Sequence, residues 1–299
     1  MSTSIDKSPS LRKLIMDIAH FFRQADIYYG HGTDSPDNEA FYLVLASLDL
    51  PFELTDKQLQ QKLAPEETMM IWKLATRRVE ERIPVAYLVN KAWFAGLPFY
   101  VNEKVLIPRS PIAELIEESF APWVSESRVK RVLDIGTGSA CIAIACAAAF
   151  PEAIIDAVDI DPAALDVARI NVEAYQLADR VRLIQSDLYE ALADNNYDLI
   201  IANPPYVDAD DMQSLPMEFR HEPALALAAG VDGLDIVRRI IRESGRHMNQ
   251  DAVLIVEVGN SQQAMESAFP ELPLIWLDFE RGGDGVFLLH AEDLADNDK

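Results

Sequence analysis

The sequence predicts an α/β protein with a doubly wound, mostly parallel sheet, an antiparallel hairpin at its C-terminal end, and a small helical domain in front. Residues 8–81 carry apolar residues at spacings of three and four, which is typical of amphipathic helices. From Val129 onward, short apolar runs alternate with helical stretches, which is typical of a parallel sheet covered on both faces. We therefore expect a helical domain over residues 1–88, a β-hairpin linker over 89–108 and the α/β domain over 109–299.

The helical domain is predicted from three amphipathic stretches separated by turn-rich segments. These stretches are LRKLIMDIAHFFRQA, EAFYLVLASLDL and PEETMMIWKLATRRVEERI. The pattern then changes in AWFAGLPFYVNEKVLI, where two short aromatic and β-branched runs surround a glycine and a proline. Such runs indicate short strands joined by turns, so this segment is the expected linker.

The α/β domain is predicted from five apolar strands with helices between them. The strands are VKRVLDI, AIIDAVDI, RVRLIQSD, YDLIIAN and DAVLIVEVG. Helical stretches such as DPAALDVARINVEAYQL separate them, which makes the strands parallel. At the end of the chain, LPLIWLDFE and GVFLLHA are separated only by RGGDG, so we expect an antiparallel pair at the edge of the sheet.

The composition favours some partners and disfavours others. The formal charge of −23 over 299 residues repels phosphate backbones, so nucleic acid is a disfavoured partner and a basic protein a favoured one. The same charge equally serves solubility. Cys141 and Cys146 lie five residues apart on a predicted helix, on different faces, so we expect neither a disulfide nor a metal site. The chain starts without a signal-peptide core and has no run long enough to span a bilayer, which predicts a cytoplasmic protein that does not act on membranes.

A glycine loop between the first strand and the next helix indicates a nucleoside-containing cofactor. Gly136 and Gly138 allow a ligand to approach the backbone at a helix N-terminus, and Asp159 ends the next strand about 20 residues later, where a ribose-binding acid is expected. Dinucleotide-binding loops have a further glycine at the place of Cys141, so a nicotinamide cofactor and a dehydrogenase are the minority interpretation.

The alternative pattern, Gly-x-Gly-x-Gly, is that of S-adenosylmethionine enzymes, with Ala140 in the third glycine's place. An alanine adds one methyl group and is strained only where the backbone needs a positive φ. Asp134 is expected to order the loop or to face the cofactor's ammonium group, and Asp187 to reach the adenine or to cap a helix. The predicted cofactor-binding residues are Asp134, Gly136, Thr137, Gly138, Asp159, Asp187 and Asn203.

The fourth strand ends in Asn203-Pro204-Pro205-Tyr206, a rigid row of acceptors beside an aromatic ring. An ordinary turn after a strand remains the alternative for this motif. With the strand order 3-2-1-4-5, the motif faces the glycine loop across the crevice at the carboxyl ends of the strands. Acceptors suit a substrate that presents an NH₂ group: Asn203 and Pro204 hold the amide protons, and Tyr206 packs on the planar group during an in-line methyl transfer.

These residues resemble the NPPY methyltransferases, which modify planar amide or exocyclic nitrogens. RIPVAYLVNKAWFAGLPFYVNEKVLIPRSPIAELI is similar to the hairpin linker of the protein-(glutamine-N5) methyltransferases. The resemblance covers nearly the whole chain and implies a Rossmann-like methyltransferase sheet, S-adenosylmethionine as cofactor, a helical substrate-recognition domain, and Asn203 to Tyr206 as the catalytic and substrate-binding motif.

The segment 108–114 reads Pro-Arg-Ser-Pro-Ile-Ala-Glu, where the members acting on release factors read Pro-Arg-Pro-Asp/Glu-Thr-Glu. This departure resembles the branch that methylates the third protein of the large ribosomal subunit, a basic substrate, either free or within an assembly intermediate. By position, Arg109 and Glu222 are further candidates for substrate binding. The alternatives are a release-factor methyltransferase, a nucleic-acid adenine methyltransferase, which should show a basic groove, and a non-catalytic assembly factor.

Overall fold

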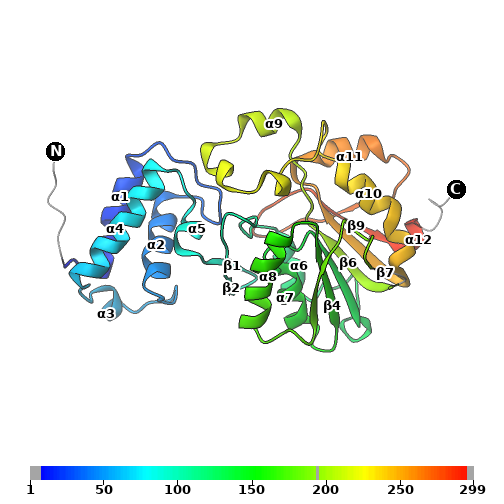
Figure 1. Cartoon of the computed structure of the whole chain (residues 1–299), viewed down its shortest axis with the longest axis horizontal. Helices are drawn as coiled ribbons and strands as arrows, with labels where there is room; N and C mark the ends of the chain where they lie inside the picture. The colour runs from blue at the N-terminus through cyan, green and yellow to red at the C-terminus, as the bar shows by residue number, and fades with distance from the viewer. Residues whose placement is uncertain (1–7, 193–194, 295–299) are drawn as a thin grey trace. The chain divides into compact units, whose positions relative to one another are not determined.

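The computed structural model describes residues 8–192 and 195–294, and the chain forms two compact units (Figure 1). The helical unit comprises Met1–Ala92 together with Pro216–His221. The α/β unit comprises Trp93–Leu215 and Glu222–Lys299. The chain therefore returns once to the helical unit from within the α/β sequence, which the sequence analysis does not anticipate.

The helical unit is built on the three amphipathic stretches expected from the sequence. Each helix begins at a favourable site: the Ser35 side chain accepts a hydrogen bond from the Asn38 amide, and Pro36 and Pro65 open their helices where a missing N–H does no harm. The main helices are α1 (Leu11–Arg23), α2 (Pro36–Ser47) and α4 (Pro65–Glu80), with short helices α3 (Asp56–Leu59) and α5 (Val85–Val89).

A buried ion-pair network closes the helical unit around Arg78, whose side chain is 1% exposed. Its guanidinium donates to Glu39 at 2.9 Å, to Glu218 at 3.2 Å and to the Tyr28 carbonyl at 2.6 Å. Glu218 also accepts from the Tyr28 backbone N–H at 2.9 Å. Glu218 belongs to the returning segment Pro216–His221, so that segment is held by buried, charge-assisted hydrogen bonds.

The expected hairpin is present as a two-stranded sheet of β1 (Ala92–Phe94) and β2 (Leu97–Phe99). Its turn residues Ala95 and Gly96 both have positive φ, 47° and 73°. Two successive positive φ values are those of a type I′ turn, whose twist matches that of paired strands.

The described part of the α/β unit contains a seven-stranded sheet in the order β5-β4-β3-β6-β7-β9-β8. The first five strands are parallel and follow the expected order 3-2-1-4-5, while β9 is antiparallel to both β7 and β8. The strands are β3 (Arg131–Ile135), β4 (Ile154–Asp159), β5 (Val181–Gln185), β6 (Tyr197–Ala202), β7 (Met248–Glu257), β8 (Ile275–Trp276) and β9 (Val286–His290). The predicted doubly wound α/β fold with an antiparallel C-terminal pair is confirmed.

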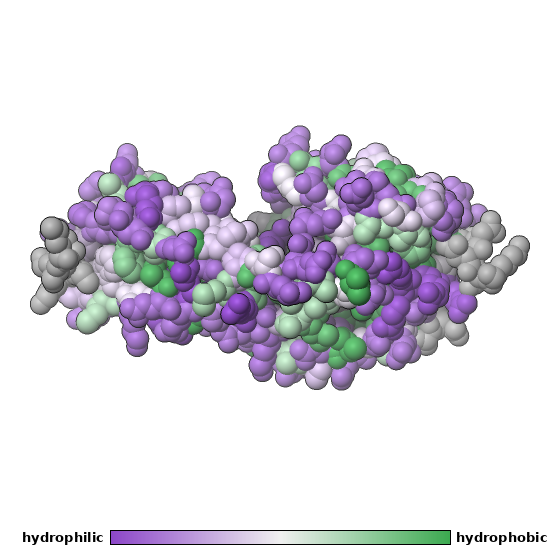
Figure 2. All heavy atoms as spheres, turned by 90° about the horizontal axis from the view of Figure 1, so that it is seen from above, coloured by the Kyte–Doolittle hydropathy of each residue, from purple (hydrophilic) through white to green (hydrophobic). Residues whose placement is uncertain are grey.

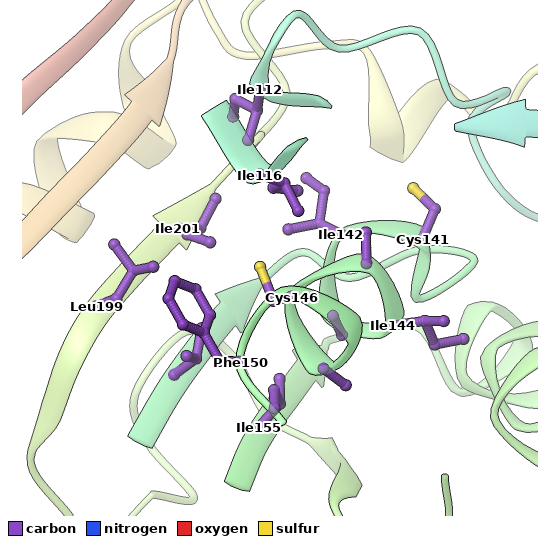
Figure 3. Close-up of a cluster of buried hydrophobic side chains, with 14 of the residues drawn as sticks. Ile112, Ile116, Cys141, Ile142, Ile144, Cys146, Phe150, Ile155, Leu199 and Ile201 are labelled. Carbon is purple, nitrogen blue, oxygen red and sulfur yellow. The ribbon is translucent and has the colours of Figure 1, made fainter. Parts of the chain in front are cut away.

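Helices cover both faces of this sheet, which is why its strands are apolar on both sides (Figure 1). On one face, Ile201 and Ile155 pack with Ile116 of a covering helix and with Phe150, which directly follows another (Figure 3). The helices of this face are α6 (Ile112–Glu117), α7 (Cys141–Ala149) and α8 (Pro162–Ala174). The other face packs against α10 (Asp235–Ser244), α11 (Gln262–Ala268) and α12 (Ala291–Leu294).

The face of the molecule drawn in Figure 2 is largely polar. Hydrophilic residues dominate the face drawn in Figure 2, and apolar residues form small, separated groups on it. Within the described residues, we find no helix with both the length and the apolar character needed to cross a membrane.

Candidate active site

Three neighbouring strands end at one edge of the sheet and carry the predicted site residues. Ile135, near the end of β3, pairs with Val158 of β4 on one side and with Ala202 of β6 on the other. The glycine loop directly follows β3, Asp159 is the last residue of β4, and Asn203 directly follows β6. The point at which the strand order reverses therefore lies between the glycine loop and the NPPY motif, as expected.

The glycine loop presents open backbone toward the NPPY motif. Gly136 and Gly138 have φ values of 71° and 53°, which favour glycine. A Cβ on Gly136 would lie 3.9 Å from its nearest neighbour, the Asn203 carbonyl oxygen, and one on Gly138 would lie 4.0 Å from the Gly136 oxygen. Since no atom fills the space that these side chains would occupy, a ligand can approach the backbone there.

Ala140 also adopts a left-handed conformation, with φ of 62° and ψ of 23°, immediately before α7. A positive φ strains any residue that carries a Cβ, and alanine is the smallest of these. The side chain is fully buried, so its methyl group contributes packing that offsets part of the strain.

Asp134, in the last part of β3, forms hydrogen bonds with the glycine loop and with the helix that follows it. Its Oδ2 accepts hydrogen bonds from the Thr137 hydroxyl at 2.5 Å and the Ala143 amide at 3.2 Å, while Oδ1 is buried without a partner among the described residues. Burial raises the pKa of the Asp134 carboxyl to about 7, against the opposing effect of these hydrogen bonds. Asp134 thus contacts both the glycine loop, at Thr137, and the first turn of α7, at Ala143.

Asp159, at the end of β4, braces the same loop. Its two carboxylate oxygens accept from the Gly138 and Asp161 amides, each at 2.9 Å. Burial raises the pKa of the Asp159 carboxyl above its usual value. Asp159 therefore lies in contact with the glycine loop, at the carboxyl end of its strand.

Asp187 follows β5 and pairs with Arg239 of α10 at 2.9 Å. About a third of each side chain is exposed. The alternative role of helix N-cap does not apply, because residues 188–192 form turns instead of a helix.

The NPPY motif has one feature that distinguishes it from an ordinary turn. The side-chain oxygen Oδ1 of Asn203 is buried and has no hydrogen-bond partner within the described residues. Pro204 is buried, and Pro205 and Tyr206 are half-buried beside it. Because an unpaired buried acceptor is unfavourable, Asn203 Oδ1 is suited to accept a hydrogen bond from a ligand.

Tyr206 is fixed at both its backbone and its ring. Its hydroxyl donates to Glu257 at 3.0 Å, and its carbonyl accepts from the Ser261 hydroxyl at 3.1 Å. A Cβ on Gly259 would lie 2.6 Å from the Tyr206 ring, so the ring packs directly on that backbone. Burial, followed by the Glu257 charge, raises the pKa of Tyr206 well above its usual value.

Arg109 and Glu222 are brought together as a bidentate pair. The two guanidinium nitrogens donate to the two Glu222 oxygens at 2.6 and 2.8 Å, and the Ile107 amide also donates to Glu222 at 3.0 Å. The Glu222 side chain is fully buried, whereas that of Arg109 is 23% exposed. Of the two, Arg109 is the one with surface for a substrate.

Comparison with known proteins identifies the family. Residues 118–230 match the model of the methyltransferase small domain. The chain is 45% identical to a ribosomal protein uL3 glutamine methyltransferase of Burkholderia pseudomallei, with 98% of each chain covered. It is 46% identical to a protein of the same name from Bordetella pertussis, with 95% of this chain and 96% of the relative covered. The chain belongs to the ribosomal protein uL3 glutamine methyltransferase family. The resemblance drawn from the NPPY motif and the 108–114 segment is thereby confirmed.

A solved structure shares the fold of these glutamine methyltransferases. The catalytic domain of hMettl16, crystallised with a hairpin of the MAT2A 3′UTR, aligns with a TM-score of 0.50 over 80% of this chain and 86% of that chain. Their sequences are 18% identical, so the likeness concerns the fold alone.

Two residues at the site of this family member are missed by the sequence analysis. Asn171 of α8 is 2% exposed: its Nδ2 donates to the Ser139 and Tyr100 carbonyls at 2.9 and 3.0 Å, and its Oδ1 accepts from the Tyr100 amide at 2.8 Å. Glu257 ends β7 and contacts Tyr206. The available signals were a lone asparagine in an apolar helix face and a lone acid in the strand VLIVEVG.

The two cysteines are buried thiols on α7. Both are free, and both belong to the buried hydrophobic cluster, in which Cys146 lies at the centre and Cys141 at the edge (Figure 3). Burial raises the pKa of the Cys141 thiol to about 12. Within the described residues, no group of three or more His, Cys, Asp or Glu side chains is arranged to hold a metal ion.

Proposed function

We propose that this protein uses S-adenosylmethionine to methylate the side-chain amide nitrogen of a glutamine in the ribosomal protein uL3. Two findings support the proposal: membership of the uL3 glutamine methyltransferase family, and the buried Asn203 Oδ1 that has no partner among the described residues. The second finding carries the chemistry, because a buried acceptor without a donor is completed by a substrate that brings an N–H group.

The residues at the strand ends fit the cofactor. The space that side chains at Gly136 and Gly138 would fill is open, and Asp134 Oδ1 is a buried acceptor without a described partner. We assign the glycine loop with Thr137 to the amino-acid part of the cofactor, with Asp134 toward its ammonium group. Asp159 is assigned to the ribose and Asp187 to the adenine side. When bound, S-adenosylmethionine supplies an electrophilic methyl group for an in-line displacement.

The NPPY motif then orients the glutamine amide. Asn203 Oδ1 and the Pro204 carbonyl accept its two N–H groups, and Tyr206 lies beside its planar group. A planar amide nitrogen is a weak nucleophile because its lone pair is delocalised. Acceptors that bind more strongly as the nitrogen becomes positive stabilise the transition state in preference to the ground state.

The substrate's charge complements that of the enzyme. A formal charge of −23 favours a basic ribosomal protein over RNA, and the exposed edge of Arg109, held by Glu222, adds a hydrogen-bond donor for the substrate backbone. The reaction then takes place in the cytoplasm, on uL3 alone or within an assembly intermediate.

Methyl transfer from labelled S-adenosylmethionine tests the proposal. Purified uL3, ribosomal RNA and release factors are offered together, and the labelled product is analysed by mass spectrometry. We expect label on one glutamine of uL3. Label in RNA or on a release factor would contradict the assigned substrate, and a wild-type enzyme that transfers no label would contradict the enzymatic assignment itself.

Asn203→Ala is the matching test of the acceptor role. We expect kcat to fall about 10²- to 10³-fold, the effect of removing one preorganised hydrogen bond to a transition state. The dissociation constant of S-adenosylhomocysteine, measured by calorimetry, should change far less. Equal losses in kcat and cofactor affinity would assign Asn203 to cofactor binding alone.

A further inference from the structure

Glu257 is a buried acid at the candidate site that has no assigned role in the proposed reaction. It is the last residue of β7, only 5% exposed, and lies next to the strand that carries the NPPY motif, since Val256 pairs with Ala202. A carboxylate buried this deeply is unfavourable unless hydrogen bonds compensate for the lost water. Its surroundings should therefore reveal what it holds in place.

Both oxygens of the Glu257 carboxylate are engaged by side chains of the site. Oε1 accepts from the Tyr206 hydroxyl at 3.0 Å, and Oε2 accepts from the Ser110 hydroxyl. Ser110 is 7% exposed and also accepts from the Ile112 amide at 3.2 Å. Ser110, Glu257 and Tyr206 thus form one buried chain of hydrogen bonds, the Ser110–Glu257–Tyr206 chain.

We propose that Glu257 is a positioning residue that fixes the Tyr206 ring in the glutamine-binding site through this chain. The inference rests on the proposed function, because it assigns Glu257 a role in that same reaction. Tyr206 has two other restraints, the Ser261 hydrogen bond on its carbonyl and the Gly259 backbone under its ring. Neither of these two restraints contacts the Tyr206 hydroxyl. The hydrogen bond to Glu257 holds the hydroxyl, and with it the edge of the ring that carries it.

Ser110 connects this chain to the sequence departure at 108–114. Proline, which the release-factor pattern has at this place, carries no hydroxyl and cannot donate to Glu257. The serine holds Glu257 through Oε2, the carboxylate oxygen that Tyr206 does not use. Ser110, one member of the Ser110–Glu257–Tyr206 chain, is therefore a residue at which this sequence differs from the release-factor pattern.

A similar group at the other end of the sheet provides a matched control. Asp156 is 1% exposed and accepts from the Tyr197 hydroxyl at 2.9 Å and from Arg131 at 2.7 Å. Tyr197 and Arg131 begin their strands, far along the sheet from the carboxyl ends where the site lies. Substitutions there also disturb a buried carboxylate–tyrosine hydrogen bond, but away from the site.

Steady-state methyl transfer to uL3 by the full-length variants tests the proposal. For Glu257→Ala we expect kcat to fall roughly tenfold to a hundredfold, the range expected for misplacing a reacting group by about 1 Å. Cofactor affinity should remain within about threefold of wild type, because the glycine loop is untouched. Glu257→Gln keeps an acceptor for Tyr206, so it should retain activity within roughly fivefold of wild type.

Tyr206→Phe and the double variant Tyr206→Phe/Glu257→Ala complete the cycle. If both residues act through one hydrogen bond, the kcat of the double variant should lie within about twofold of the kcat of the slower single variant. Tyr197→Phe and Asp156→Asn should lower the melting temperature and leave kcat unchanged. Two results would overturn the proposal. One is a fold-loss in kcat for the double variant that equals the product of the two single losses, and the other is a kcat of Glu257→Gln as low as that of Glu257→Ala.

A crystal structure of Glu257→Ala gives a readout that does not depend on the substrate. We expect the Tyr206 ring to leave its wild-type position; an unmoved ring would overturn the positioning role whatever the activity. Failure of the proposed function looks different, because the wild-type enzyme would then label RNA or a release factor instead of uL3. The two hypotheses are therefore separable in the same set of experiments.

Discussion

At the residue scale, Asp134 makes the stability of the cofactor-free protein depend on pH. Its folded-state pKa of about 7 lies above the unfolded value of 3.8, so the folded state favours the protonated carboxyl. Its contribution to the free energy of unfolding is fully present below about pH 4 and is lost as pH rises through 7, by roughly 4 kcal/mol in total.

Asp134→Asn removes this dependence, because the amide oxygen can still accept from Thr137 and Ala143. Urea unfolding at pH 5 and pH 8 should show a smaller drop in unfolding free energy for the variant than for wild type. The same drop in both proteins would show that Asp134 is ionised in the folded state at pH 5.

The places of the candidate site residues at the strand ends were largely predictable, and their hydrogen-bond partners were not. Gly136, Gly138 and Asn203 are recognisable because residue type and position after a strand specify their chemistry. The positive φ of Ala140 and the Asp187–Arg239 pair were not predictable. Backbone conformation and pairing depend on the tertiary structure, which residue type and spacing do not contain.

At the element scale, α8 holds the glycine loop through Asn171. Asn171→Ala leaves Ser139 and Tyr100 with unpaired backbone groups, so we expect a loss of about 2–4 kcal/mol in unfolding free energy. The affinity for S-adenosylhomocysteine should fall about tenfold, since the loop that binds it is less ordered. Calorimetry and urea unfolding measure both quantities.

Glu173→Ala is the control on the same helix, because Glu173 is exposed. It should change both quantities little. If Asn171→Ala lowered stability with unchanged cofactor affinity, Asn171 would be a structural residue without influence on the loop.

The arrangement of the elements followed from the sequence where its signals are local. Alternating strands and helices predicted the parallel order, and RGGDG predicted the antiparallel pair. The sequence did not predict that β9 lies between β7 and β8. A hairpin pattern indicates that two strands pair with each other, but it does not indicate which of the two also pairs with the rest of the sheet.

At the scale of the whole molecule, the Arg78 network fixes the returning segment Pro216–His221 in the helical unit. Arg78→Met leaves Glu39 buried without its cation and leaves Glu218 with Arg82 alone, at 3.4 Å, so we expect a loss of about 3–5 kcal/mol in unfolding free energy. The neighbouring pair Arg77–Glu81 is exposed, and Arg77→Met should lose less than about 1 kcal/mol. Urea unfolding of both variants makes the comparison, and equal losses would mean that the Arg78 network adds nothing beyond a surface pair.

The return of the chain also sets the order in which the protein can fold during synthesis. Glu218 follows Arg78 by 140 residues, so the helices made first lack a buried partner until most of the α/β sequence has been translated. A fragment that ends at residue 92 carries the Arg78 cation without one of its two carboxylates. The buried network of the helical unit therefore cannot be completed before the segment that follows the NPPY motif has been synthesised.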